Sequence, residues 1–217
     1  MSLKSVEDRL AELVGEIDPE DPRGRKRRRI LEAASELFVA HGYRKASIGD
    51  IARRAGIAKG TFYLYFESKI DVLVATIAWE KLRSLAAFSS LFDESLPPRE
   101  RLRRWVSTAL VVVARSPLLS RLVGGDEELS AVMAELNPEL LAQASRDQFA
   151  IFGELLAAAV PGSWSADEMR ERIAAMSTVF YVAPLLRVDH VRQGMSIERL
   201  ADRIGELAID GIGSKEG

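Results

Sequence analysis

Four side chains between Lys59 and Tyr65 carry hydrogen-bonding groups of the kind that proteins use to bind nucleic acids. Lys59 offers an ammonium group, Thr61 a hydroxyl, and Tyr63 and Tyr65 each a hydroxyl on an aromatic ring. Such groups bond to base edges and phosphates, and a short helix can present them together from its outer face. Tyrosines at this spacing also fill small hydrophobic cores, so both interpretations of the two tyrosines stay open at this point.

A helix-turn-helix is the element that must position these side chains. Ser47 is expected to cap a helix over residues 48–55, with Asp50 as its acidic partner in the first turn. A four-residue turn that contains glycine then leads into a third helix, residues 59–65, whose N-terminal end would face the major groove. The predicted core of this unit consists of Ile51, Ala52, Ala55, Ile57 and Phe62.

Basic residues are concentrated around the same unit. Residues 23–69 contain twelve lysines and arginines but only four acids, which gives a net charge of +8 and leaves −10 for the rest of the chain. A basic segment on an acidic body attracts a polyanion locally while the rest of the molecule repels it. Charge alone does not decide the question, because a run of charges is also typical of a solvated surface.

Helical periodicity extends over most of the chain, and no segment shows the alternating pattern of a β-strand. The predicted fold class is therefore all-α. Prolines, glycines and capping residues mark the ends of the helices. The expected helices span residues 3–17, 25–41, 48–55, 59–65, 69–92, 99–115, a short piece within 117–123, 137–160, 166–191 and 196–212.

About forty residues of this N-terminal region closely resemble the tetracycline-repressor (TetR) family of bacterial transcriptional regulators. The resemblance implies an N-terminal three-helix DNA-binding domain followed by a larger helical domain for ligand binding and dimerisation. We expect an N-terminal extension over 1–24, partly helical or disordered, then the two domains over 25–70 and 71–217. The matching residues are Ile30-Leu31-Glu32-Ala33-Ala34, Leu37-Phe38, His41-Gly42-Tyr43, Ser47-Ile48-Gly49-Asp50-Ile51-Ala52, Ala55 through Phe66, and Ser68-Lys69.

The resemblance also implies roles for single residues. Ser47 and Lys69 are expected to contact phosphates, and Lys59, Gly60 and Thr61 to meet base edges and backbone. Two further sets are expected to grip phosphates: the tyrosines at 63 and 65, and a basic arm or first-turn clamp within residues 25–29. From that clamp we select Arg25 and Arg28 as DNA contacts. Position 64 is often aromatic or polar in relatives. Here it is Leu64, whose side chain can only make an apolar contact with DNA or pack against the protein.

The C-terminal segment carries many apolar and aromatic residues, and the resemblance suggests that its helices enclose a site for a small-molecule inducer. Trp105, Phe152 and Phe180 are the first candidates to line that site. Few charges interrupt the apolar stripes, which favours a neutral or lipophilic ligand. Plain core packing is the competing interpretation for each of these residues.

Homodimerisation is expected through the last two long helices, residues 166–191 and 196–212, as the resemblance implies. Phe180 is expected to lie in this interface as well. A symmetric dimer places two recognition helices on one palindromic DNA site.

The predicted function is a dimeric repressor that a small molecule releases from a palindromic operator in double-stranded DNA. No cofactor, metal site, enzymatic motif or membrane span is expected, and the chain contains no cysteine. A cytoplasmic location follows by elimination. Two alternatives remain: a constitutive DNA-binding protein without an inducer, and a helical lipid-carrying or catalytic protein with a vestigial DNA module.

Overall fold

A computed structural model describes residues 3–93, 95–136, 150, 152–160, 162 and 164–212. Within these ranges the chain is helical and contains no strand, which confirms the all-α fold class. Residues 152–159 are helical as well, and the rest of the expected helix 137–160 lies largely outside the described residues. The α-helices are α1 (Leu3–Val14), α2 (Pro22–His41), α3 (Ile48–Arg54), α4 (Lys59–Phe62), α5 (Lys69–Ser84), α6 (Pro98–Arg115), α7 (Pro117–Val123), α8 (Glu127–Leu136), α10 (Ala166–Thr178), α11 (Asp189–Arg192) and α12 (Ile197–Ile212), and two 3₁₀ segments are η1 (Leu85–Phe92) and η2 (Val179–Arg187).

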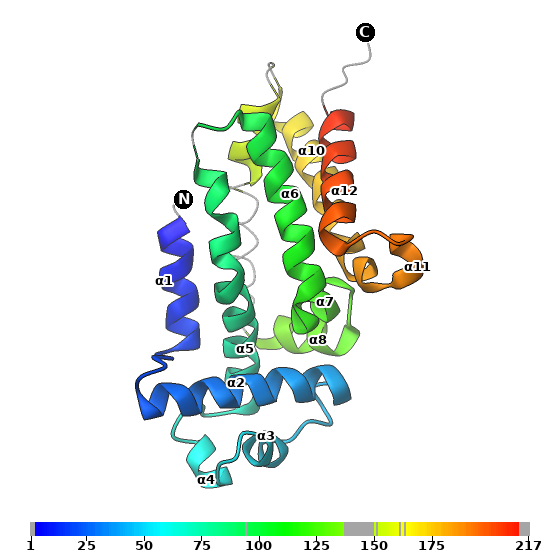
Figure 1. Cartoon of the computed structure of the whole chain (residues 1–217). Coiled ribbons are helices and arrows are strands. Elements are labelled where there is room, and N and C mark those ends of the chain that lie inside the picture. The colour runs from blue at the N-terminus through cyan, green and yellow to red at the C-terminus, as the bar shows by residue number, and fades with distance from the viewer. Residues whose placement is uncertain are drawn as a thin grey trace.

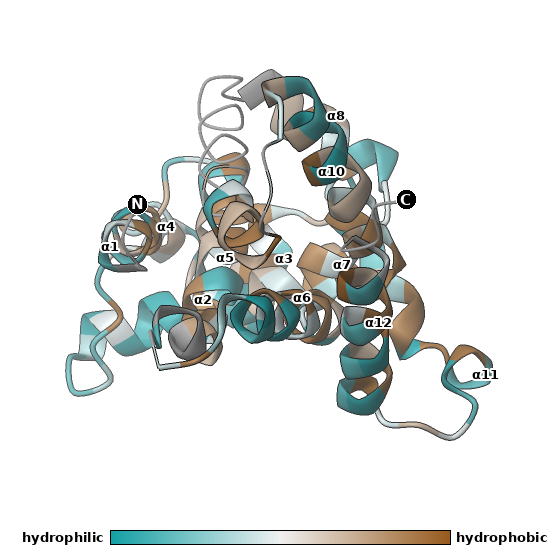
Figure 2. Ribbon diagram, turned by 90° about the horizontal axis from the view of Figure 1, so that it is seen from above, coloured by the Kyte–Doolittle hydropathy of each residue, from teal (hydrophilic) through white to brown (hydrophobic). Residues whose placement is uncertain are grey.

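The three helices α2, α3 and α4 form one end of the molecule, and α5 leads from them into the helical body (Figure 1). α1 lies alongside α5, with which it is in contact, and α12 packs against α6 in the body. Viewed from above, hydrophobic segments gather towards the middle around α5, whereas much of α2 and α12 is hydrophilic (Figure 2). No single described helix is both long and apolar enough to cross a membrane; α6 and α7 together meet those criteria but are bent by 108°.

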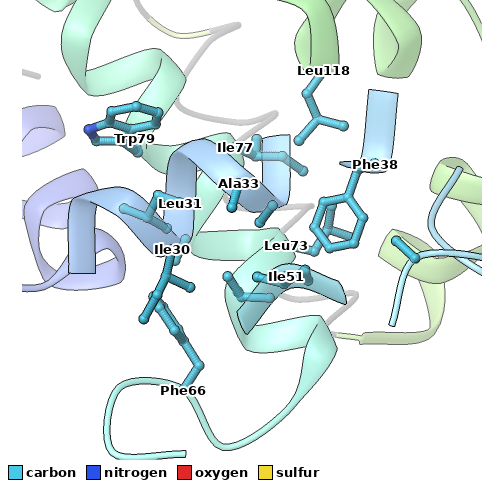
Figure 3. Close-up of a cluster of buried hydrophobic side chains, with 14 of the residues drawn as sticks. Ile30, Leu31, Ala33, Phe38, Ile51, Phe66, Leu73, Ile77, Trp79 and Leu118 are labelled. Carbon is cyan, nitrogen blue, oxygen red and sulfur yellow. The ribbon is translucent and has the colours of Figure 1, made fainter. Parts of the chain in front are cut away.

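One hydrophobic core joins the three-helix end to the start of the body. Ile30 and Phe38 of α2 meet Ile51 of α3, and Leu73 of α5 and Leu118 of α7 complete the same cluster (Figure 3). All five side chains are fully buried. At about 1.5–3 kcal/mol per buried large apolar side chain, this shared cluster is what holds the small helices in place.

Glu80 is a buried carboxylate at the junction of three helices. It projects from α5, accepts a hydrogen bond of 2.8 Å from the Ser35 hydroxyl of α2, and accepts one of 3.3 Å from the main-chain N–H of Leu119 in α7. Burial raises the pKa of this carboxyl, and the hydrogen bond from Ser35 opposes that shift. Glu80 therefore fastens α2 to α7, which are far apart in sequence.

Arg121 of α7 forms a second link between the body and α2. Its guanidinium donates to the main-chain carbonyls of Phe38 (2.5 Å) and Val39 (3.1 Å), and it forms an ion pair with Asp126. The last carbonyls of a helix have no partner within the helix and carry partial negative charge. Arg121 thus caps the C-terminal end of α2 from outside the three-helix unit.

The C-terminal helices differ from the sequence-based expectation. The helix expected over residues 166–191 is α10, η2 and the short α11, with Pro184 inside η2 and extended backbone at Val188. Proline has no N–H to donate and its ring crowds the preceding turn, so an uninterrupted α-helix cannot pass through this position. The helix expected to reach residue 92 likewise ends at Ser84 and continues as η1, and α8 was not expected from the sequence.

The arrangement at Glu80 predicts opposite outcomes for two substitutions. Glu80→Ala leaves the Ser35 hydroxyl and the Leu119 N–H without their partner, and we expect the free energy of unfolding to fall by about 1–3 kcal/mol. Glu80→Gln keeps an acceptor and removes a charge that is unfavourable when buried, so its stability should equal or exceed that of the parent at neutral pH. Urea unfolding followed by circular dichroism measures both.

The pH dependence provides the control for this prediction. A carboxyl whose folded pKa is raised stabilises the protein most when protonated, and that contribution is lost as the pH rises through the folded pKa. The difference in stability between Glu80→Gln and the parent should therefore shrink as the pH falls towards the ordinary range of a glutamate. A Glu80→Gln variant as unstable as Glu80→Ala would contradict this account.

Candidate nucleic-acid interface

The turn between α3 and α4 has the geometry of a helix-turn-helix. Ser47 caps α3, as expected, by accepting a hydrogen bond from the Asp50 N–H at 3.1 Å. After α3, Gly56 has a φ of +67°, a conformation that L side chains rarely adopt, and the Ile57 N–H donates to the Ala52 carbonyl at 3.0 Å. The chain therefore reverses tightly, and α4 begins at Lys59.

α4 is shorter than the helix expected over residues 59–65. The α-helix ends at Phe62, and the chain continues in turns closed by hydrogen bonds from the Tyr65 N–H (2.9 Å) and the Phe66 N–H (3.1 Å) to the Phe62 carbonyl. A helix of one turn has almost no stability of its own, because forming the first turn fixes several residues for a single hydrogen bond. Its geometry must come from tertiary contacts.

Two phenylalanines supply those contacts. Phe62 is fully buried and Phe66 is 4% exposed, and their ring centroids lie 5.8 Å apart within the core shared by α2, α3 and α5. Phe66 is drawn next to Ile30 of α2 in Figure 3. With both rings directed inward, the side chains between them are displayed on the outside.

The outer face of this segment is the part of the candidate site that the structure brings together. Lys59 and Gly60 are exposed and Thr61 is half-buried. Tyr63 is 49% exposed and Leu64 is 70% exposed, so neither serves as core filling. The segment that begins with α4 thus presents an ammonium group, a hydroxyl, a phenol and a leucine side chain at one edge of the molecule.

Tyr65 differs from Tyr63. It is half-buried and packs against the core, and its carbonyl accepts a hydrogen bond of 3.0 Å from Arg27. The sequence left two interpretations open for the tyrosines, contact with DNA and filling of the core. Tyr63 faces outward and does not fill the core, whereas Tyr65 packs against the core and remains partly exposed.

The basic residues at the start of α2 belong to a regular helix and do not form an extended arm, so the clamp on the DNA backbone is the expected form that stays as a prediction. Arg25 is exposed and donates to the carbonyls of Pro19 and Glu20 at 2.9 Å each. Arg28 is exposed and pairs with Glu32 at 3.4 Å. Such an exposed pair contributes little stability, so the Arg28 guanidinium can exchange its carboxylate partner for a phosphate.

Ser47 and Lys69 are already engaged within the chain. The Ser47 hydroxyl donates to the Asp50 carboxylate at 2.6 Å, and this bond is the largest reason that the pKa of Asp50 is lowered. Lys69 donates to the carbonyls of Tyr43 (2.8 Å), Arg44 (3.3 Å) and Ala46 (3.1 Å), and burial lowers its pKa.

An ammonium group has three N–H donors, and three carbonyls surround that of Lys69. The structure thus gives Lys69 a role that the sequence did not suggest: it fastens the loop after α2 to the start of α5. It also lies 4.3 Å from the centroid of the Tyr43 ring. This structural role is an alternative to the phosphate contact expected from the resemblance, which stays a prediction.

The three candidate ligand residues lie together in the body. The rings of Trp105 and Phe152 are stacked with centroids 4.8 Å apart, and Phe180 meets Trp105 edge-on at 5.1 Å. All three are buried, within the second hydrophobic cluster of the chain. They fill the interior of the body between α6, residues 152–159 and η2. Among the described residues, no group of acidic or histidine side chains has the arrangement of a metal site.

The expected role of Phe180 in a dimer interface is wrong for this structure, because the ring is 8% exposed within a single chain. Among the described C-terminal elements, the large apolar side chains that face outward most are Tyr181 (66% exposed) and Leu185 (51%) of η2 and Leu207 (74%) of α12, followed by Val191 (36%) of α11. η2 and α12 are in contact with each other. The sequence missed this division because 3₁₀ segments and α-helices direct their side chains differently.

Comparisons with known proteins point to the same region. Residues 30–76 match the family described as bacterial regulatory proteins, tetR family. The chain is 31% identical over 103 residues, 48% of each chain, to the fatty acid metabolism regulator protein of Bacillus subtilis. The aligned part therefore spans about half the length of that curated relative.

Solved structures resemble the chain over most of its length. A TetR-like transcriptional regulator from Rhodococcus sp. RHA1 is 25% identical with a TM-score of 0.62, and the match covers 90% of this chain and 100% of that one. The transcriptional regulator FadR from Bacillus subtilis, solved in complex with stearoyl-CoA, is 20% identical with a TM-score of 0.62. That match covers 85% of this chain and 98% of FadR, and it shows the similarity of fold.

The engagement of Lys69 predicts that it stabilises the fold and does not bind DNA. Lys69→Met should lower the free energy of unfolding by about 1 kcal/mol or more, because the loop carbonyls lose their donor. It should leave the slope of log affinity against log salt unchanged, whereas loss of a phosphate contact flattens that slope by about 0.9. Lys45→Met, at an exposed lysine of the same loop, is the control for stability. A flattened slope with unchanged stability would restore the phosphate contact.

Proposed function

We infer that this chain belongs to the TetR family of bacterial transcriptional regulators and is a dimeric repressor. It binds a palindromic operator and is released from it by a lipophilic small molecule. Like the relatives it matches, it is a regulator of transcription and not an enzyme. The observation that carries the proposal is the exposed edge of α4, held rigidly by Phe62 and Phe66 beside the basic first turns of α2.

In this proposal the exposed edge of α4 enters the major groove. Lys59 and Thr61 contact base edges. A Cβ at Gly60 would meet nothing within 4 Å in the free protein, so this position faces open space, and the bare glycine lets the backbone come close to the DNA. Leu64 offers an apolar contact of the kind that suits a thymine methyl group. Tyr63 and Tyr65, together with Arg25, Arg28 and Ser47, contact the phosphate backbone and set the register.

The proposed inducer site is the aromatic cluster of Trp105, Phe152 and Phe180. Apolar, aromatic-lined interiors between helices are typical places for small ligands. One relative by name regulates fatty acid metabolism, and one solved structure of similar fold holds stearoyl-CoA. Both support a ligand with a long apolar part. Such a ligand would have to displace or rearrange these packed rings, which gives it different affinities for two conformations of the body.

The proposed dimer uses the exposed apolar side chains of η2 and α12. Tyr181, Leu185 and Leu207 each expose more than half of their area in the single chain. The elements that carry them, η2 and α12, are in contact with each other, and apolar side chains exposed on adjoining elements are typical of interaction surfaces. A two-fold dimer would set the two α4 helices on successive major grooves, about 34–36 Å apart.

We propose that this regulator acts in the cytoplasm, where its operator DNA is located.

The DNA-reading role predicts how operator preference changes. The operator is first obtained by selecting binding sequences from a random pool of duplexes with the purified protein. Lys59→Ala and Thr61→Ala should then each lose about 1–3 kcal/mol of discrimination at one base pair of each half-site. Arg170→Ala, an exposed arginine on α10, is the control and should preserve the ranking. If no sequence is enriched, or if both variants rank operator sequences as the parent does, the proposed readout is incorrect.

The dimer surface predicts that Leu207→Glu separates the subunits without unfolding them. A carboxylate at this exposed position costs nothing in the single chain but would be desolvated and unpaired in the interface. Sedimentation equilibrium should show a monomer with a circular dichroism melt close to that of the parent, together with loss of operator binding. Leu64→Glu, at the other strongly exposed leucine, should remain a dimer. A dimeric Leu207→Glu protein would contradict the proposed interface.

A further inference from the structure

α1 is an additional helix that lies outside the segment matched by the family description. It is amphipathic, and its buried Val14 and partly buried Leu10 and Leu13 pack into the core that α2 and α5 share. In Figure 1 it runs beside α5, on the molecule's edge and away from the exposed edge of α4. Its packing anchors the N-terminal segment to the fold, although this segment makes none of the DNA contacts proposed above.

The connection from α1 to α2 is folded tightly against the first turn of α2. Asp21 caps α2 by accepting a hydrogen bond of 2.9 Å from the Gly24 N–H. A Cβ at Gly24 would lie 2.3 Å from the Asp18 carbonyl oxygen, so only glycine permits this approach. Gly15, which follows the end of α1, has a φ of +70°. The end of α1 is therefore held at a fixed place beside α2.

Arg27 of α2 joins this fixed end of α1 to the end of the recognition segment. Its Nε donates to the Val14 carbonyl at 2.5 Å, and another nitrogen of the same guanidinium donates to the Tyr65 carbonyl at 3.0 Å. The guanidinium also lies 4.4 Å from the centroid of the Phe66 ring. The Val14 carbonyl is the last of α1, where carbonyl groups lack partners within the helix, and the Tyr65 carbonyl lies in the turns that follow α4. Unlike the exposed Arg25 and Arg28, Arg27 points inward.

We propose that α1 is a strap that positions the DNA-reading segment, and that Arg27 is the positioning residue which transmits its effect. α4 has one turn and cannot hold its own orientation. Phe62 and Phe66 anchor its side chains, while the Arg27 bridge fixes the carbonyl of Tyr65 relative to α1 and, through it, to α5. Arg27 would then support operator affinity without touching DNA. This inference rests on the proposed DNA-binding function.

Gly15 provides a variant that disturbs the bridge without changing a charge. A Cβ at Gly15 would lie 2.7–2.8 Å from the Arg27 guanidinium, so Gly15→Ala should push this side chain aside. The matched control is Gly194→Ala: Gly194 has a similar φ of +82°, but nothing lies within 4 Å of its Cβ position. Both substitutions place an alanine at a positive φ and so introduce a similar kind of backbone strain, and only the first displaces Arg27.

The experiment compares the parent, Gly15→Ala, Arg27→Met and Gly194→Ala as full-length proteins. Operator affinity is measured over a range of salt concentrations, and amide hydrogen exchange is followed by mass spectrometry over residues 59–66. Gly15→Ala and Arg27→Met should each weaken binding about tenfold, as expected for losing a hydrogen bond to a charged group. Both should keep the salt slope of the parent and exchange faster over residues 59–66, and Gly194→Ala should behave as the parent.

Two results would overturn the strap. One is parent-like exchange over residues 59–66 in both Gly15→Ala and Arg27→Met. The other is a salt slope flattened by about 0.9 in Arg27→Met together with parent-like binding by Gly15→Ala, which would make Arg27 a phosphate contact. If the parent protein selects no operator, the proposed function fails instead, and the exchange measurement still tests the strap on its own.

Discussion

The burial of Phe62 and Phe66 is the interaction on which the proposed DNA-reading surface depends. α4 has four residues, and an isolated helix of that length does not form in water. The two rings bind the segment to a core built by α2, α3 and α5, and Gly56 supplies the turn that brings it there. Because the anchors face inward at positions 62 and 66, the intervening Tyr63 and Leu64 must face outward.

The same core packs the three-helix end directly against the start of the body. α5 contributes side chains to it along most of its length, and α7 reaches it through Leu118. Glu80 and Arg121 then fix α2 to α7 with hydrogen bonds that leave little freedom for relative movement. A ligand that rearranged the body near α6 and η2 would therefore shift α7 and, with it, α2. Interfaces packed in this way tend to switch between discrete arrangements rather than deform gradually.

The sequence predicted those parts of the fold that depend on local patterns. The apolar spacing of Ile30 and Phe38, the Ser47 cap and the glycine turn all identify their elements from neighbouring residues. The directions of long basic side chains could not be predicted, because Lys69 and Arg27 are turned inward by carbonyls that are distant in sequence. The sequence placed Phe180 both in the inducer site and in the dimer interface, because apolar spacing does not show where an α-helix gives way to η2. In our proposal, Lys69 therefore fastens the fold instead of contacting a phosphate, and the dimer surface lies at exposed residues such as Leu207.

Site-specific crosslinking tests the central claim, that the edge of α4 lies in the major groove, most directly. A photo-crosslinking amino acid placed at position 64, where the native leucine is 70% exposed, would be activated in the complex with the selected operator. The account predicts a crosslink to one base at equivalent positions in both half-sites, and none from the same group at position 207. An operator-bound protein that crosslinks from position 207 but not from position 64 would contradict it.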